Sequence, residues 1–225
     1  MRRSFNLIKF LGIAFIICFV FDGVLHSQKG NRYEFESAHI EKTSKTVTSG
    51  IEITTKDDIY IADYGKKQVT FTTQIQNITM ANMVTESKTV SIIDGEWLIN
   101  YDTEKKKGTK MKFNLADKFS GMSEEDMKKF AEQMGDATGT ETKDIGTKEI
   151  AGKTCKGTEA TSNMMGMKTK STMWQYGNFT MEMVTEGAGT NIKEGVTKFE
   201  EGIKVDPKLF LVHDDVDITT VKSPY

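Results

Sequence analysis

The side chains that most often perform catalysis are scarce in this sequence. Histidine occurs only three times, and His26 falls in an N-terminal segment that we expect to be removed, which leaves His39 and His213. The sequence has no GxSxG motif, no HExxH, no P-loop and no GxGxxG following a strand pattern. We therefore expect no enzyme, no catalytic residue and no cofactor.

Three short segments could support metal or thiol chemistry. HDDVD (213–217) groups a histidine with aspartates near the C-terminus, but a solvated acidic tail explains it better. NMMGMK (163–168) offers thioether ligands for Cu(I), although Met164 and Met165 would point to opposite faces of a strand and methionine commonly fills apolar gaps. Cys155 has lysines on both sides, yet a small buried strand residue is the favoured interpretation. We expect no metal site.

Binding of an apolar group is the chemistry that the sequence indicates best. The stretch WQYGNFTMEM (174–183) contains Gly177-Asn178, which suits a type II′ turn of two residues. Folding there pairs Tyr176 with Phe179 and Trp174 with Met181. One face of the hairpin then carries Trp174, Tyr176, Phe179, Met181 and Met183. This face could pack into a core or line a pocket.

A second hairpin is predicted in TVSIIDGEWLINY (89–101). Asp94-Gly95 is favoured in a two-residue type I′ turn, which would pair Ile93 with Glu96 and Ile92 with Trp97. One face would then collect Val90, Ile92, Trp97, Ile99 and Tyr101. Period-two alternation in GIEIT (50–54) and VTFTTQI (69–75), with further strands at 147–162 and 191–199, predicts an antiparallel meander.

One helix is predicted among the strands, in SEEDMKKFAEQMG (123–135). Ser123 is suited to the N-cap, and acidic residues follow it in the first turn. Met127, Phe130 and Met134 fall on one apolar stripe. The width of that stripe matches the aromatic hairpin face, so we expect the helix to lie across a curved sheet.

The N-terminus has the layout of a secretory signal peptide. Arg2, Arg3 and Lys9 precede an apolar run, FLGIAFIICFVF, which is shorter than the ~20 residues of a membrane-spanning helix. We expect residues 1–27 to be removed after Ser27, with an uncleaved anchor as the alternative. Cys155 would then be the only thiol, so no intramolecular disulfide can form.

The remaining chain suits one domain, residues 28–212, followed by a loose acidic tail at 213–225. Only two prolines occur, so no proline-rich linker divides the chain. The formal net charge is −2, with both signs interspersed, which disfavours nucleic acid as a partner.

The order of these motifs resembles a known superfamily. IIDGEWLINYD (92–102), the helical interruption, IAGKTCKG (150–157), a W-x-Y strand and VTKFEEGIKVDPKLF (196–210) follow one another as in the periplasmic lipoprotein-carrier (LolA/LolB-like) superfamily, and in particular in a branch of exported proteins with that fold. The resemblance covers most of residues 31–212. It implies an α+β fold, mostly antiparallel β: a half-open curved β-barrel with helices covering its concave apolar face.

Members of this superfamily hold acyl chains of lipoproteins or other lipids in that cavity. Carried over here, the helix would cover a wall formed by the aromatic hairpin. The candidate ligand-binding residues are Trp174, Tyr176, Phe179, Met181, Met183, Met127, Phe130, Met134 and Trp97. The arginine with which carriers lock the helical cover has no counterpart, because Arg32 is the only arginine outside the signal segment. Transfer of lipoproteins to a receptor is therefore not implied.

Two functional hypotheses remain open, with a thiol or metal role a distant third. The first is an exported carrier or sensor, periplasmic or secreted, that binds a lipid or acyl chain. The second is a cell-envelope interaction module with a protein partner and a self-filled core. An apolar groove open to solvent would favour the first, and a packed interior with an exposed apolar patch on the convex face would favour the second. The sequence leaves the oligomeric state open.

Overall fold

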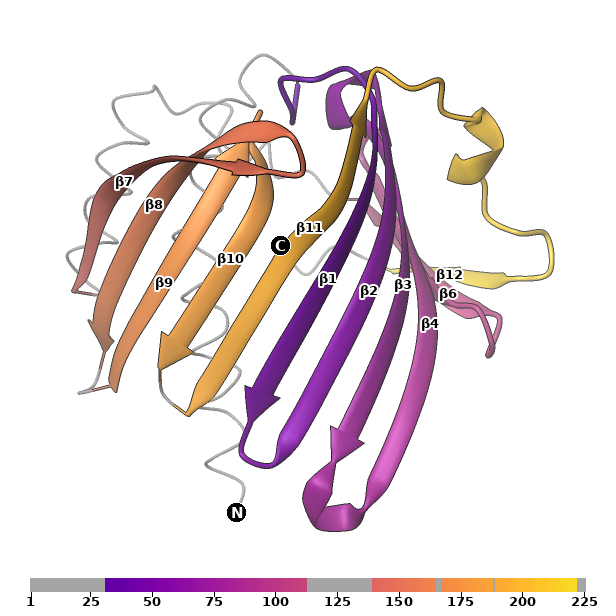
Figure 1. Ribbon diagram of the computed structural model, residues 1–225. Coiled ribbons are helices and arrows are strands. Elements are labelled where there is room, and N and C mark those ends of the chain that lie inside the picture. The colour runs from indigo at the N-terminus through magenta and orange to yellow at the C-terminus, as the bar shows by residue number, and fades with distance from the viewer. Residues whose placement is uncertain (1–30, 113–138, 165–166, 188, 222–225) are drawn as a thin grey trace.

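The computed structural model describes residues 31–112, 139–164, 167–187 and 189–221, and within them one large curved sheet dominates (Figure 1). The predicted signal segment and the predicted helix at 123–135 lie outside the described residues. The same holds for Met127, Phe130 and Met134. Within the described residues there is no helix long and apolar enough to cross a membrane.

The elements follow one another as hairpins. In chain order they are β1 (Ala38–Thr48), β2 (Ile51–Ala62), η2 (Asp63–Gly65), β3 (Lys67–Ile78), η3 (Thr79–Ala81), β4 (Met83–Asp94), β5 (Trp97–Asp102), β6 (Lys107–Lys112), β7 (Thr140–Ile150), β8 (Lys153–Met164), β9 (Met167–Tyr176), β10 (Phe179–Gly187), β11 (Thr190–Glu201), η4 (Pro207–Phe210) and β12 (Asp217–Thr220).

The sheet joins two meanders through its first strand. Its order is β12-β6-β5-β4-β3-β2-β1-β11-β10-β9-β8-β7, so β1 pairs with β2 on one side and with β11 on the other. All neighbours are antiparallel except β12, which runs parallel to β6. The edge strands β7 and β12 do not pair with each other, so the sheet is curved but open (Figure 1). The predicted mostly antiparallel, half-open sheet is confirmed, whereas the helical cover falls on undescribed residues.

The hairpin of β4 and β5 has the predicted faces but a different register. Asp94 pairs with Trp97 and Ile92 with Ile99, so Gly95 and Glu96 form the loop. Gly95 has φ +59°, which suits the first loop position of a type II′ turn. The predicted pairing of Ile92 with Trp97 was therefore wrong by two residues. Since side chains alternate with period two, a shift of two leaves every side chain on its predicted face.

The hairpin of β9 and β10 turns where predicted and then departs from the predicted register. Gly177 and Asn178 both have positive φ, as in a type I′ turn rather than II′, and Tyr176 pairs with Phe179. A β-bulge at Met181 then shifts the register, so Trp174 lies opposite Glu182 instead of Met181.

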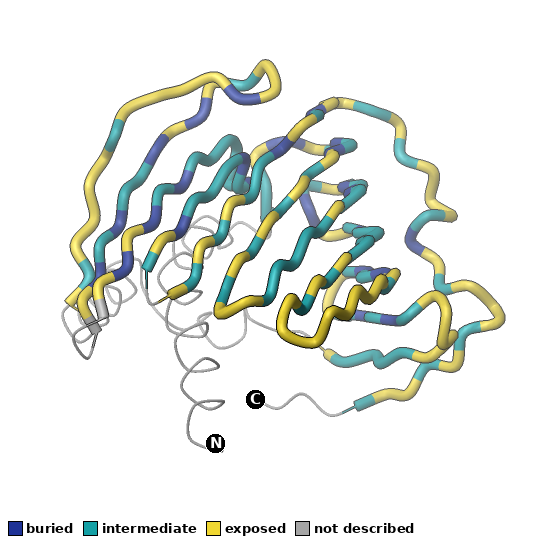
Figure 2. Tube along the Cα trace, turned by 60° about the horizontal axis from the view of Figure 1, so that its bottom comes forward, coloured by how far each residue is buried: buried dark blue, intermediate teal, exposed yellow. Residues whose placement is uncertain are grey.

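Two clusters of buried side chains stabilise the sheet. The aromatic core contains Phe35, Ala38, Ile40, Ile59, Ile61, Ile150, Cys155, Phe179, Met181, Val196 and Phe199, with Tyr33, Trp174 and Tyr176 packed against it. The C-terminal core contains Val69, Val90, Ile92, Ile99, Tyr101 and Phe210. Figure 2 shows buried positions alternating with more exposed ones along the strands, and an edge strand β7 that is almost wholly exposed.

The chain after β11 covers the C-terminal core. Asp206 accepts a hydrogen bond from the backbone N–H of Lys208 at 2.9 Å, which caps η4 and positions Phe210 against β3 and β4. Beyond η4, Asp215 forms an ion pair with Lys106, and β12 adds to the edge of β6. Where the sequence suggested a loose tail from residue 213, the described part of that tail is thus attached to the sheet.

Apolar side chains that stay exposed concentrate at one end of the sheet. The tip patch, as we name it, consists of Val47, Ile75, Met80, Met83 and Val84, on or beside the β1–β2 and β3–β4 turns, and Met80 is 91% exposed. These two turns lie at the same end of the molecule, at the bottom of Figure 1.

Removing side-chain volume from the C-terminal core should destabilise the fold strongly. We expect Ile92→Ala to lower the free energy of unfolding by about 2–5 kcal/mol, because Ile92 is 0% exposed and its loss leaves a cavity. Ile93→Ala is the matched control, since Ile93 lies on the opposite face of β4 and is only partly buried. Urea denaturation measures both. Equal losses would contradict the assigned faces.

Candidate functional site

The aromatic face predicted to line a lipid cavity is filled by the chain itself. Phe35, in the segment before β1, stacks on Tyr33 with ring centroids 5.2 Å apart and meets Phe199 edge-on at 5.2 Å. Its ring also stacks on Tyr176 at 6.3 Å and contacts Phe179 at 6.5 Å. Tyr33 and Phe35 therefore pack on the hairpin face, where Phe179 and Met181 are buried and Trp174 and Tyr176 are partly buried.

The structure separates the candidate residues into two groups. Four of them meet in the aromatic core: Phe179 and Met181 are buried, while Trp174 and Tyr176 pack against the cluster. Met183 instead pairs with Met173 and Glu194 beyond the bulge. Trp97 lies on β5, in the other half of the sheet, where the Nζ atoms of Lys110 and Lys112 lie over its ring.

Sequence reasoning missed Tyr33 and Phe35, which complete the aromatic core. The segment NRYEFES (31–37) has no strand of its own, so it was not assigned to the core. The sequence did contain a signal for this packing. Tyr33 and Phe35 are separated by one residue shortly before a strand, and an extended backbone there would place both rings on the same side. Gly65 permits the close approach, since a Cβ there would lie 2.7 Å from the Tyr33 ring.

A polar contact closes the rim of the aromatic core. Lys153 Nζ and the Tyr176 hydroxyl both donate to Glu201 Oε2, the latter at 2.9 Å, and Lys153 lies over the Tyr176 ring at 5.0 Å. The hydrogen bond from Lys153 holds the pKa of Glu201 below its ordinary value. Burial raises the pKa of Tyr176, and the hydrogen bond to Glu201 adds to this effect. The rim is thus a charged pair anchored on aromatic rings.

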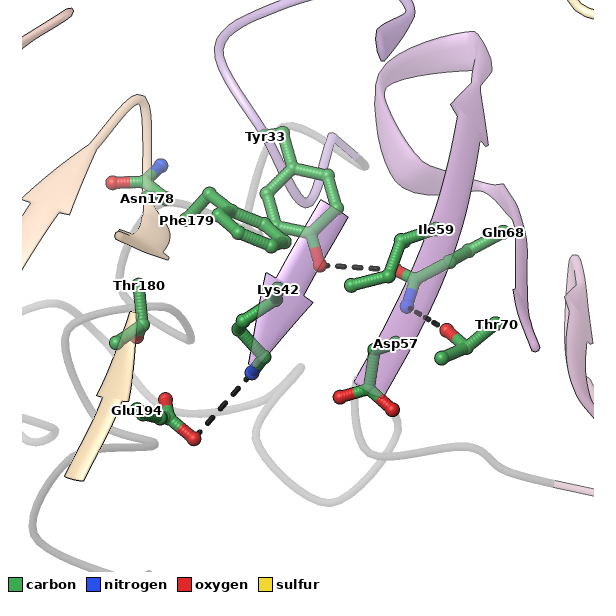
Figure 3. A pocket seen from close by; sticks show the side chains of 10 residues that line it. All are labelled: Tyr33, Lys42, Asp57, Ile59, Gln68, Thr70, Asn178, Phe179, Thr180 and Glu194. Carbon is green, nitrogen blue, oxygen red and sulfur yellow. Dashed lines mark hydrogen bonds and ion pairs between the residues drawn. The ribbon is translucent and has the colours of Figure 1, made fainter. Parts of the chain in front are cut away.

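Beside the aromatic core, the sheet has a hollow of about 330 Å³. It is lined by Tyr33, Lys42, Asp57, Ile59, Gln68, Thr70, Asn178, Phe179, Thr180 and Glu194, which Figure 3 shows arranged around one space. These residues come from the neighbouring strands β3, β2, β1, β11 and β10, together with Tyr33 and the β9–β10 turn. The hollow therefore spans five adjacent strands of the curved sheet.

Hydrogen bonds order the right-hand wall of the hollow in Figure 3. The Tyr33 hydroxyl donates to Gln68 Oε1 at 3.0 Å, and Gln68 Nε2 donates to Thr70 Oγ1 at 3.3 Å. Burial raises the pKa of Tyr33, so the phenol stays protonated and keeps donating. The wall therefore presents hydroxyl oxygens of fixed orientation.

Charged side chains form the floor of the hollow. Lys42 Nζ lies 3.5 Å from Glu194 Oε2, and each of these side chains is only 18% exposed. Asp57, directly opposite Lys42 on β2, accepts a hydrogen bond from Thr72 Oγ1 at 2.7 Å. The described part of the concave face is therefore mixed in polarity, not the continuous apolar surface that the resemblance implied.

The segments considered for metal or thiol chemistry show no such site within the described residues. Cys155 is fully buried, burial raises its pKa, and its thiol lies 3.3 Å from the Lys153 carbonyl oxygen. In the described ranges, no three His, Cys, Asp or Glu side chains are grouped so that they could hold a metal ion. Cys155 thus acts as a small core residue.

Comparison with known proteins gives structural neighbours of low identity. No protein-family model and no curated protein matches the sequence. Similar solved structures include MucB in complex with MucA(peri), at 10% identity and a TM-score of 0.43, with 91% of this chain and 62% of the MucB chain covered. This chain thus spans less than two thirds of the MucB chain.

Two further structures cover 83% of this chain and 94% of their own. They are LprF from Mycobacterium bovis, at 11% identity and a TM-score of 0.35, and an outer membrane lipoprotein-sorting protein domain from Vibrio parahaemolyticus, at 9% and 0.33.

The rim contact makes stability depend on pH in a defined direction. Because the pKa of Glu201 is lowered by folding from its ordinary 4.5, its contribution is present above pH 4.5 and is lost as the pH falls through the folded-state pKa. We expect Glu201→Gln to be less stable than the parent above pH 4.5, and the two to converge on acidification. Chemical denaturation across this pH range measures the difference.

The control for this prediction is Glu34→Gln, which changes an exposed acid just before the aromatic core. It should leave the pH dependence of stability unchanged. A constant gap between Glu201→Gln and the parent at every pH would mean that the carboxylate charge does not stabilise the rim.

Proposed function

We propose that this chain is an exported, non-enzymatic binding protein of the carrier or sensor type that takes an amphipathic ligand into its concave hollow. The observation that carries the proposal is the hollow itself, in which Ile59 and Phe179 adjoin charged and hydroxyl groups. Export is supported by the basic and apolar N-terminal pattern of residues 1–27.

The lining favours a ligand with an apolar chain and a polar group over a purely apolar one. Burying each CH₂ contributes about 0.8 kcal/mol, so even the limited apolar surface of Ile59, Phe179 and the Tyr33 ring supports binding of a short alkyl segment. An apolar group placed against Asp57 would leave its charge desolvated with only the Thr72 hydroxyl as a partner, which is costly.

Polar side chains continue along the concave face away from the aromatic core. The next cross-strand row consists of Ser44, Thr55, Gln74 and Ser87, which pair with one another in register. A ligand extending along this row would meet hydroxyl and amide groups. The apolar part of the ligand is therefore best placed at the Phe179 end of the hollow.

Filling the hollow should abolish ligand binding without disturbing the cores. We expect Thr70→Trp to eliminate co-purifying lipid-like molecules and binding of a fluorescent fatty amphiphile, because the indole would occupy the space beside Ile59. Native mass spectrometry of protein exported to a bacterial periplasm, together with a fluorescence titration, measures this.

Thr73→Trp is the matched control, since Thr73 lies on the opposite face of the same strand. It should bind like the parent. A parent protein that is free of ligand as purified and also ignores added amphiphiles would contradict the carrier proposal, and so would equal binding by both variants.

A second candidate function is a cell-envelope interaction module. The self-filled aromatic core and the exposed tip patch are the two features that favour it. The side chains of Val47, Ile75 and Val84 share the face opposite the hollow, since they occupy cross-strand rows that alternate with those of the concave residues.

A partner that binds the tip patch should be captured there by a photoreactive side chain. We expect Met80→p-benzoylphenylalanine to give one discrete crosslinked product in cells of the source organism, because Met80 projects from the β3–β4 turn. Glu104→p-benzoylphenylalanine, at an exposed site in the β5–β6 turn, is the control. The same products at both positions would argue against a specific interface.

A further inference from the structure

We propose that the hollow selects a ligand carrying a primary ammonium group on an apolar chain, with Asp57 as the anionic partner of that group. This inference rests on the proposed binding function of the hollow and names the chemistry of its ligand. Three features support it. Asp57 has no cationic partner among the described residues, Lys42 is paired with Glu194, and the wall next to Asp57 carries oxygen atoms that can accept hydrogen bonds.

Asp57 has a charge that no side chain of the described residues neutralises. Its hydrogen-bond donor is the hydroxyl of Thr72, at 2.7 Å, and no lysine, arginine or histidine of the described ranges forms an ion pair with it. Lys42 is its direct cross-strand neighbour but does not come within ion-pair distance of it. A half-buried carboxylate with only a neutral partner favours an approaching cation.

Lys42 is directed to the other side of the hollow. Its Nζ lies 3.5 Å from Glu194 Oε2, and Figure 3 shows this side chain turned toward Glu194 and away from Thr70. The three charged groups of the floor therefore sum to one negative charge, which lies at Asp57. A ligand cation on the Thr70 side of Asp57 would keep its distance from Lys42.

The wall beside Asp57 can accept the remaining protons of an ammonium group. An ammonium has three donors and no acceptor. Thr70 Oγ1 takes part in one described hydrogen bond and keeps a lone pair for a further donor, and Gln68 Oε1, which accepts from the Tyr33 hydroxyl, has a second lone pair. The faces of Tyr33 and Phe179 offer additional attraction to a cation and a surface for the alkyl chain.

An anionic head group fits the same space poorly. It would have to face both Asp57 and Glu194, and like charges at close range disfavour binding. Its only cationic partner among the lining residues would be Lys42, which Glu194 already engages. The hollow therefore favours a positively charged head group over a negatively charged one.

Matched ligands test this selection directly. Dodecylamine, dodecanol and dodecanoate share one chain length and differ in the charge of the head group, and butylamine keeps the ammonium without the long chain. Isothermal titration calorimetry below the micellar concentration of each ligand gives the affinities. We expect the parent protein to bind dodecylamine about tenfold or more tightly than dodecanol, and dodecanoate most weakly.

Variants assign the preference to Asp57. Asp57→Asn should reduce the amine-to-alcohol preference to about one, because it removes the charge that distinguishes the two head groups. Asp58→Asn is the matched control, because Asp58 lies on the opposite face of β2, where His39 binds it at 2.6 Å. Lys42→Gln should strengthen dodecylamine binding, since Lys42 is the one cation among the described residues that line the hollow.

The outcomes separate this inference from the proposed function. If dodecanol or dodecanoate binds as tightly as dodecylamine, the hollow is a binding site but the ammonium selection is overturned. If butylamine binds as tightly as dodecylamine, the apolar chain contributes nothing and the proposed ligand class is overturned. If none of the four binds, both the selection and the proposed function fall.

Discussion

The packing of Phe35 against the rings of Tyr176, Phe179 and Phe199 is the contact on which the aromatic core of the concave side depends. An open sheet of twelve strands leaves apolar surface on both faces, and that surface needs cover from outside the strands. On the concave face the cover comes from residues 31–37, whose rings meet those of Tyr176, Phe179 and Phe199. On the other face it comes from the chain around Phe210.

This arrangement decides where open volume remains beside the aromatic core. Because the aromatic rings are paired with one another, the open volume lies beside them, over the strands that carry Lys42, Asp57 and Glu194. For the proposed carrier function, this changes the expected chemistry of the ligand. The hollow has an apolar end formed by Phe179 and Ile59 and a charged end formed by the side chains just named. Under the proposed function, charge would be the means by which the hollow distinguishes ligands, since its apolar area is small.

The alternation of apolar and polar residues predicted which side chains share a face of the sheet. The features that it did not predict depend on a bulge and on contacts between distant parts of the chain. Period-two alternation placed Val90, Ile92, Ile99 and Tyr101 on one face correctly, because a register error of two residues preserves faces. The bulge at Met181 has no comparable signature, so the position of Trp174 opposite Glu182 was missed. Lys42 and Glu194 stand 152 residues apart in the chain, and only the pairing of β1 with the last long strand brings them together.

The short parallel strand β12 has a consequence for how the molecule behaves among copies of itself. An open sheet exposes two rows of unpaired backbone groups that can template pairing with another chain. At one edge, residues 217–220 of β12 pair with the backbone groups of β6 and leave a strand of only four residues outermost. At the other, a bulge in β7, where the Asp144 carboxylate accepts from the Gly146 N–H, interrupts the row. The four residues of β12 and the bulge in β7 thus limit the length of regular backbone that either edge offers to another copy of the chain.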